Sequence, residues 1–499
     1  MTAKRWRRQA ALLLLSVFCL VAGAAFAAPV GEVEAARGAG VVQRNGKIAR
    51  LLGRGLLLEQ GDVVTTGPDS SAVLRFVDGT RVTLRPNSRF QVQAFEYQRD
   101  GADKDKPGAM VFNLIRGGMR TLTGALPKQG PEVARVVSGA ATLGIRGTDF
   151  DVRVCAGDED CPLAGFAPEQ ARPLASPVSA RVLVAQGELG VVGASGARRI
   201  LVAGGPLYPG DVIETAGAAH AVLAFRDDTR LTLQPASRLR LDDFVFDPAN
   251  PGEGRFLVTL LAGGLRSATG QIGRADARHA GVRVGSDGLA GDGGVTLRGG
   301  GFDLERTGGA GAVLIDALPW DGGLELVRDT AACAPGAPDA PTAAIAPTAS
   351  TALIANPAAD PARTTVAGVA ARQAVRIALS GCAAPLPGDA AALAARFATP
   401  RPDTVGYAPE RLWRAVALPE LTEGLFVHVR DGHVALMTPD GTLDLGREEA
   451  GYAGPARAFG MSGGRLLRID HLPAFLRNFC SGPVLELARE SKVAMMCYR

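Results

Sequence analysis

The sequence of 499 residues is poor in aromatic side chains and in histidine. Aromatics make up 5% of the chain and there are five histidines, whereas glycine and proline number 64 and 32. Few large aromatics and many turn-forming residues favour short strands over helical bundles. We therefore predict a mainly all-β fold, and the length predicts more than one domain.

Motifs that bind metals or carry out hydrolysis are also scarce. No HExxH and no CxxC sequence occurs, and the five histidines are scattered along the chain. A zinc site at His428 and His433 would need further ligands. Calcium binding by the acidic run Asp158, Glu159 and Asp160 is the less favoured alternative to a solvated loop, because the ligand alternation of calcium loops is missing. We expect no enzyme, no catalytic residues, no cofactor and no metal.

Acidic residues are absent from the first 27 residues, where a basic start precedes an apolar run from Ala10 to Ala25. Small residues at Ala25 and Ala27 complete the pattern of a secretory signal peptide over residues 1–27, with an uncleaved anchor as the alternative. Removing this segment takes away Lys4, Arg5, Arg7 and Arg8, so the formal charge of +4 becomes 4 − 4 = 0. A neutral exported chain argues against nucleic acid as a partner.

No later apolar run reaches the roughly 20 residues of a membrane helix, so we expect no stable membrane span after cleavage. The predicted location is the periplasm or the cell surface. Six cysteines then remain in an oxidising compartment, which favours disulfides. Sequence alone leaves 15 pairings open, and we favour neighbour pairing: Cys155 with Cys161, Cys333 with Cys382, and Cys480 with Cys497.

One stretch occurs twice. GDVVTTGPDSSAVLRFVDGTRVTLRPNSRFQV from Gly61 aligns without a gap with GDVIETAGAAHAVLAFRDDTRLTLQPASRLRL from Gly210, and 16 of the 32 positions are identical. The likeness continues in RGGMRTLTG and AGGLRSATG, and in RGTDFDV and RGGGFDL. The duplication predicts two tandem units, over residues 30–175 and 176–330.

The centre of each repeat predicts a hairpin with a three-residue loop. Apolar alternation places Phe76 opposite Thr80 and Leu74 opposite Val82 only if the loop is Val77 to Gly79. Gly79 then takes a left-handed conformation, and Asp228 must take it in the second copy. We interpret Asp78, Gly79, Asp227 and Asp228 as turn residues, because nothing in the sequence brings the two carboxylates near a base.

The remaining chain divides into two parts. Residues 331–375 are rich in Pro, Ala and Thr, which predicts a linker or exposed loop. Residues 376–499 form a C-terminal region with hairpin signals in GLFVHVRDGHVALMTPDGTLDLG from Gly424, and with helical signals in AALAARFA from Ala391 and PVLELARES from Pro483.

The first unit resembles the FecR family of periplasmic domains. The resemblance rests on GDVVTTG, AVLRFVDGTRVTLRPNSRF, LIRGGMRTLTG and TLGIRGTDFDV, in the family's order, with Arg146, Gly147 and Thr148 as the RGT motif. The second unit is similar to a diverged copy, in which Gly300 stands where Thr148 stands in the first. The resemblance implies tandem antiparallel, solenoid-like β modules that act through protein contacts.

The best-known FecR proteins hold a sigma factor inside the cell and receive a signal from an outer-membrane transporter. Here nine residues precede the apolar segment, so no anti-sigma region is expected. The resemblance therefore implies an exported, non-enzymatic interaction module in envelope signalling or surface assembly, whose partner is an envelope protein, with outer-membrane proteins among the candidates. Binding of peptidoglycan or an exported polysaccharide is the alternative.

Overall fold

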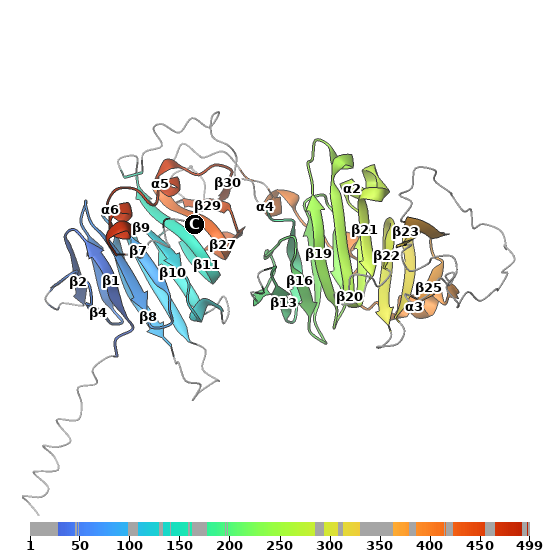
Figure 1. Ribbon diagram of the computed structural model, residues 1–499, viewed down its shortest axis with the longest axis horizontal. Coiled ribbons are helices and arrows are strands. Elements are labelled where there is room, and N and C mark those ends of the chain that lie inside the picture. The colour runs from blue at the N-terminus through green and yellow to red at the C-terminus, as the bar shows by residue number, and fades with distance from the viewer. Residues whose placement is uncertain are drawn as a thin grey trace, which may run out of the picture.

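The computed structural model describes residues 28–44, 47, 49–97, 108–128, 133–139, 141–157, 160–161, 177–194, 196, 198–284, 294–307, 313–329, 363–378, 386–413, 415, 423–454, 465–491 and 497. These residues form two units, each built on one 15-stranded sheet (Figure 1). The described part is predominantly β with a few short helices, which confirms the predicted fold class. It contains no helix that is long and apolar enough to cross a membrane.

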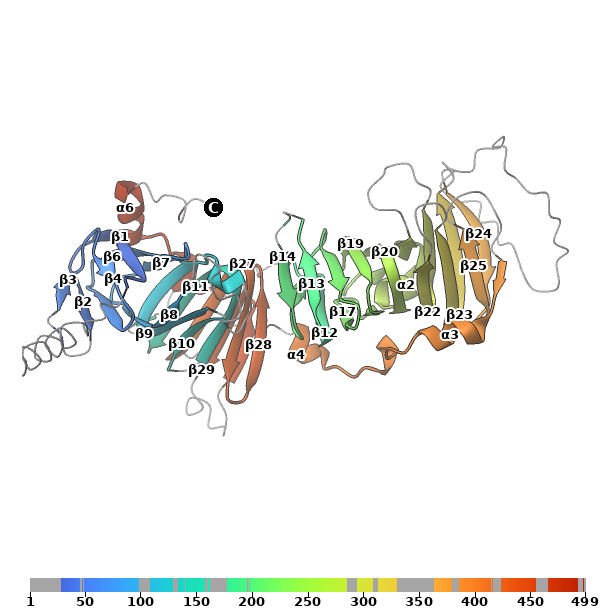
Figure 2. The same cartoon turned by 90° about the horizontal axis from the view of Figure 1, so that it is seen from below.

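The first sheet is folded over into two layers that enclose one core (Figure 2). Its shorter strands are β1 (Gly31–Arg37), β2 (Gly40–Arg44), β3 (Arg50–Leu51), β4 (Leu57–Leu58), β5 (Asp62–Thr66), β6 (Ser71–Phe76), β7 (Arg81–Leu84), β8 (Arg89–Glu96), β10 (Ala134–Ser138), β28 (Gly441–Gly446), β29 (Glu449–Gly454) and β30 (Arg465–Ile469). Layer 1 contains β3, β2, β5, β8, β10 and β28, and layer 2 contains β4, β1, β6, β7, β29 and β30.

Three long strands, β9 (Ala109–Leu122), β11 (Ala141–Ala156) and β27 (Glu423–Thr438), cross from one layer to the other. The first half of β9 pairs with β8, and its second half pairs with β7. Each crossing is marked by a glycine with positive φ: Gly117 at 83°, Gly147 at 60° and Gly432 at 86°. Glycine suits these bends because it has no Cβ to clash in the left-handed region.

The second sheet repeats this plan. Its strands are β12 (Ala180–Gln186), β13 (Leu189–Val192), β14 (Arg198–Leu201), β15 (Pro206–Leu207), β16 (Val212–Thr215), β17 (His220–Phe225), β18 (Arg230–Leu233), β19 (Arg238–Val245), β20 (Arg255–Ala268), β21 (Ala280–Val284), β22 (Val295–Thr307), β23 (Leu314–Asp329), β24 (Arg363–Val369), β25 (Ala374–Ala378) and β26 (Leu386–Gly388). The ladders are antiparallel except for one parallel pair in each sheet, β9 with β10 and β20 with β21.

The C-terminal strands complete the first sheet. Strand β27 pairs along β11 from Thr142 to Ala156, and β28, β29 and β30 continue the two layers from it. In the second sheet, β23, β24, β25 and β26 hold the matching places beside β22. The second unit is therefore inserted into the first between β11 and β27, and the predicted C-terminal region 376–499 contributes to both sheets.

Short helices accompany the sheets. They are η1 (Leu126–Lys128), η2 (Pro251–Glu253), α2 (Gln271–Ala275), η3 (Ala277–His279), α3 (Ala390–Arg396), η5 (Pro402–Thr404), α4 (Pro409–Trp413), α5 (Ala474–Arg477) and α6 (Gly482–Ser491). Helices α3 and α6 fall on the two stretches with helical signals. We name residues 389–407 and 470–491 the covering segments, because each packs on the outer face of layer 2 in its own unit.

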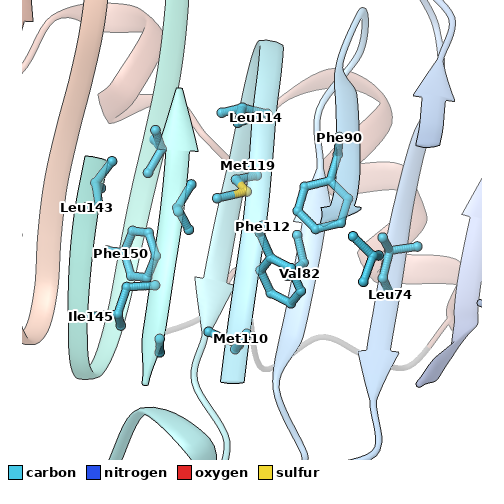
Figure 3. Packing of buried hydrophobic residues seen from close by; sticks show 14 of the residues in the cluster. Leu74, Val82, Phe90, Met110, Phe112, Leu114, Met119, Leu143, Ile145 and Phe150 are labelled. Carbon is cyan, nitrogen blue, oxygen red and sulfur yellow. The ribbon is translucent and has the colours of Figure 1, made fainter. Parts of the chain in front are cut away.

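Each core is formed by the inward faces of both layers. In the first unit, Leu74, Val82, Phe112 and Phe150 are buried together (Figure 3). Strand β27 adds further buried residues to the same cluster, so residues more than 250 positions apart share one core. Burying a side chain of this size contributes about 1.5–3 kcal/mol.

Candidate functional site

The repeated acidic hairpin has the three-residue loop that alternation predicts. Leu74 pairs with Val82 and Ala72 with Leu84, and the amide of Phe76 donates to the carbonyl of Thr80 at 2.8 Å. Gly79 has φ of 89°. In the second unit Leu223 pairs with Leu231 in the same register.

The Asp78 carboxylate is occupied by bonds within the hairpin and to the next turn. Its oxygens accept from the amide of Thr80 at 2.9 Å, the Thr80 hydroxyl at 2.8 Å and the amide of Leu126 at 3.2 Å. A Cβ on Gly124 would lie 2.3 Å from the Asp78 carbonyl oxygen, so only glycine fits there. This explains the TLTG stretch: it ties the end of β9 to the hairpin.

Asp227 repeats the arrangement, accepting from the amide and hydroxyl of Thr229 at 3.0 and 2.7 Å. Burial raises the pKa of Asp227. Its neighbour Asp228 has φ of 65° and has gained a second role, because its carboxylate accepts from the Tyr407 hydroxyl in the covering segment. Turn chemistry alone gave no sign of this contact.

The RGT motif lies where β11 crosses between the layers. Thr148 exchanges hydrogen bonds with Thr123: its amide donates to the Thr123 hydroxyl at 2.7 Å, and its carbonyl accepts from the Thr123 amide at 3.0 Å. A Cβ on Gly432 would lie 2.3 Å from the Gly147 carbonyl oxygen. The motif thus shapes a bend shared by β11 and β27.

Buried ion pairs lie next to the RGT motif, on the outer face of layer 2. Arg120 forms a bidentate pair with Asp149, at 2.9 and 2.7 Å, and Arg430 lies 2.6 Å from Asp151. Burial opposes protonation of His428, but carboxylates of Asp151 and Glu448 on either side hold the pKa of His428 above its ordinary value.

The second unit carries the same pair in altered form. Arg266 pairs with Asp303 at 2.8 and 3.1 Å, and the indole N–H of Trp320 donates to Asp303 at 3.0 Å. Gly301 stands where Asp149 stands in the first unit, and a Cβ there would lie 2.2 Å from the Trp320 ring. Gly301 therefore leaves room for the indole, and Arg266 pairs with the carboxylate that is equivalent to Asp151.

A buried polar junction joins the two units, and sequence reasoning did not find it. Arg181 of β12 is 1% exposed and forms an ion pair with Glu449 of β29, which is 5% exposed. The amide of Arg447 donates to the Tyr208 hydroxyl at 2.6 Å. Arg468 approaches Glu449 at 3.4 Å.

Charge compensation stabilises this junction. Burial alone would raise the pKa of Glu449, but Arg181 and Arg468 lower it to about 2. Burial raises the pKa of Tyr208 to about 12. The two units pack closely at Gly446, because a Cβ on this glycine would collide with Pro206 and Tyr208.

The cysteines close two loops. Disulfides join Cys155 to Cys161 and Cys480 to Cys497, while Cys333 and Cys382 lie outside the described residues. Of the acidic run, Asp158 and Glu159 also lie outside them, and Asp160 pairs with Arg153. His433 bonds to Asp444 at 2.8 Å, and the described residues contain no cluster of three or more groups that could hold a metal ion.

Together, these contacts organise strands and covering segments. Asp78 and Asp227 lie in separate sheets, and the carboxylates discussed above are engaged by arginine, histidine, hydroxyl or backbone groups.

A family model described as FecR protein matches residues 62–164. The matched segment runs from β5 through the hairpin and the RGT motif to just beyond Cys161, so this part of the chain is FecR-like. Strands β1 to β4 and the closing strands β27 to β30 lie outside the match. No curated protein matches the chain.

Proposed function

We propose that the chain is a non-enzymatic exported protein with two FecR-like units, the second inserted into the first and not in tandem with it, which acts as a protein-interaction module in envelope signalling or surface assembly. The observation that carries the proposal is the match at residues 62–164, whose strand plan recurs across the second sheet. A FecR domain suggests a module related to signalling.

Export of the chain is supported by its cysteine chemistry and its first residues. The disulfides Cys155–Cys161 and Cys480–Cys497 persist in oxidising compartments. The basic and apolar start of the sequence directs the chain across the membrane. The place of action is the periplasm or cell surface, and the partner is an envelope protein, with outer-membrane proteins among the candidates.

A contact role fits the chemistry of the buried acids in the first unit. Asp78, Asp149 and Asp151 each bond to groups of the scaffold itself. A carboxylate used in this way positions backbone and does not serve as a free base.

In vivo cross-linking of the mature chain, followed by identification of the captured proteins, tests the proposal. We expect one or a few envelope proteins to be captured reproducibly. Capture of none, together with retention on purified sacculi or turnover of a defined substrate, would contradict it.

A further inference from the structure

The junction between the units uses two different ends of the same fold. Each unit has a surface that we call its N-end. It is formed by the ends of β1, β4 and β6 in the first unit and by the ends of β12, β15 and β17 in the second. We call the turn that joins β28 to β29, or β24 to β25, its C-end. In the junction, the C-end of the first unit (446–449) contacts the N-end of the second (Figure 2).

The edge strands and the turn of this junction have equivalents on surfaces that are exposed in the described part of the chain. Glu32 pairs with Leu57 in the first unit as Arg181 pairs with Pro206 in the second. The turns match as well: Glu448 and Arg372 have φ of 59° and 65°. Their amides donate to the carbonyls of Val429 and Pro319, each at 2.7 Å.

The two ends that meet in the junction are buried, whereas the N-end of the first unit and the C-end of the second are exposed. In the junction, Pro206, Tyr208, Gly446 and Glu449 are buried. At the N-end of the first unit, Leu57 is 51% exposed and Val77 is 49% exposed, and both line an open depression together with Glu32. At the C-end of the second unit, residues 370–373 are all exposed.

The charges at the free ends are complementary, with the sign opposite to that in the junction. In the junction the N-end presents the cation Arg181 and the C-end presents the anion Glu449. At the free ends the N-end presents the acid Glu32, whose carboxylate also contacts Arg75. The C-end presents the amide Gln373 at the place of Glu449, with the exposed cation Arg372 beside it at the place of Glu448. A carboxylate accepts hydrogen bonds from a guanidinium and from an amide.

We propose that copies of this chain associate head to tail, the turn 370–373 of one copy docking on the Glu32, Leu57 and Val77 surface of the next. The contact reproduces the junction within the chain, so a partner of the right shape already exists in the molecule. It buries two exposed aliphatic side chains and pairs unlike charges.

Such a contact joins two different surfaces, so it does not close on itself as a two-fold dimer does. Heterologous contacts give rings or open chains of copies.

Sedimentation velocity of the purified mature chain over a range of concentrations tests the proposal. We expect the wild type to form species larger than a dimer as concentration rises. Glu32→Arg and Arg372→Glu should each weaken self-association by about tenfold or more. An equimolar mixture of the two variants should regain association, because the unchanged Glu32 of one variant meets the unchanged Arg372 of the other, and the new arginine meets the new glutamate.

The control is Arg89→Glu, the same charge reversal at an exposed position on β8 in the middle of the first sheet, and it should associate like wild type. A wild type that stays monomeric, or variants that do not complement each other in the mixture while circular dichroism shows them folded, would overturn the proposal. This proposal extends the contact role proposed above to a second copy. Its failure would leave the capture of envelope partners by cross-linking unaffected, so the two proposals can fail separately.

Discussion

At the scale of single residues, the repeated acid of the hairpin is a building element. Asp78 accepts three hydrogen bonds from buried donors of the hairpin and of the turn that starts at Leu126. Such a donor loses its partner when the acid is removed, and it cannot turn to water. The second unit keeps the acid and its threonine while it changes the neighbouring glycine to Asp228.

Asp78→Ala is therefore expected to lower the free energy of unfolding by about 3 kcal/mol, because it leaves buried donors unsatisfied. Urea denaturation followed by circular dichroism measures the change. Asp69→Ala, at an exposed turn position, serves as the matched control and should stay close to wild type. An Asp78→Ala variant as stable as the control would show that the hairpin does not depend on this carboxylate.

At the scale of elements, the covering segments are attached through arginine and hydroxyl contacts. In the first unit, Arg85 donates to the carbonyls of Phe475 and Asn478, and its guanidinium lies 5.3 Å from the centre of the Phe479 ring. Gln234 stands at the matching place in the second unit and contacts Thr399. Each unit thus covers layer 2 with its own C-terminal segment through a different side chain.

Arg85→Ala should loosen the covering segment of the first unit and leave its sheet intact. Arg85 is half-buried, and removing its guanidinium leaves the carbonyls of Phe475 and Asn478 without this donor, at a cost of about 1–3 kcal/mol. Amide hydrogen exchange in residues 474–491 should therefore accelerate. Arg89→Ala, at an exposed position on β8 in layer 1, should leave that exchange unchanged. Equal acceleration in both variants, or acceleration spread over β6 and β7, would contradict a local role for Arg85.

Local strand pairing could be predicted from the sequence, whereas the pairing of distant strands could not. The register of β6 and β7 follows from local alternation and from a glycine at one turn position, so it could be predicted. The pairing of β11 with β27 spans the whole inserted unit, and no local pattern selects one distant strand over another. A signal existed in the likeness of RDGHVAL from Arg430 to WDGGLEL from Trp320, which marks the same bend in both units.

The junction was beyond sequence reasoning for a further reason. Arg181 and Glu449 are ordinary charged residues in their local sequences, and only the return of the chain to the first sheet brings them together. The attraction within such a pair offsets the cost of burying both ions, and removal of one partner is strongly destabilising because an uncompensated charge stays buried.

At the scale of the whole molecule, acid should weaken the junction. The pKa of Glu449 is about 2 in the folded chain, against 4.5 for an ordinary glutamate. A lowered pKa means that the folded state favours the ionised form, so this stabilisation is full above pH 4.5 and is lost as pH falls from 4.5 to about 2. A difference of this size corresponds to about 3 kcal/mol.

Unfolding of wild type and Glu449→Gln over this pH range measures the effect. We expect the variant to be less stable near neutral pH by about 3 kcal/mol, with the difference shrinking towards pH 2. Glu490→Gln, on the exposed face of α6, should follow wild type at every pH. A constant gap between Glu449→Gln and wild type would mean that Glu449 does not contribute through its charge.

The insertion of one unit into the other also determines which stretch of the chain each sheet needs. The second sheet is complete within residues 177–413, whereas the first sheet needs β27 to β30 from residues 423–469. The first core also takes Val427, Val429 and Leu436 from that segment. The two units therefore differ in whether a continuous stretch of chain can fold alone.

Residues 177–413 expressed alone should unfold cooperatively, and residues 28–176 expressed alone should aggregate. Without β27, the long strand β11 would present an unpaired edge, and exposed edges of this kind recruit other chains. Supplying residues 423–499 as a separate chain should restore solubility to residues 28–176, measured by co-purification and by cooperative unfolding of the complex. If residues 28–176 folded alone and gained no stability from residues 423–499, the C-terminal strands would be an addition to a finished unit and not its closing part.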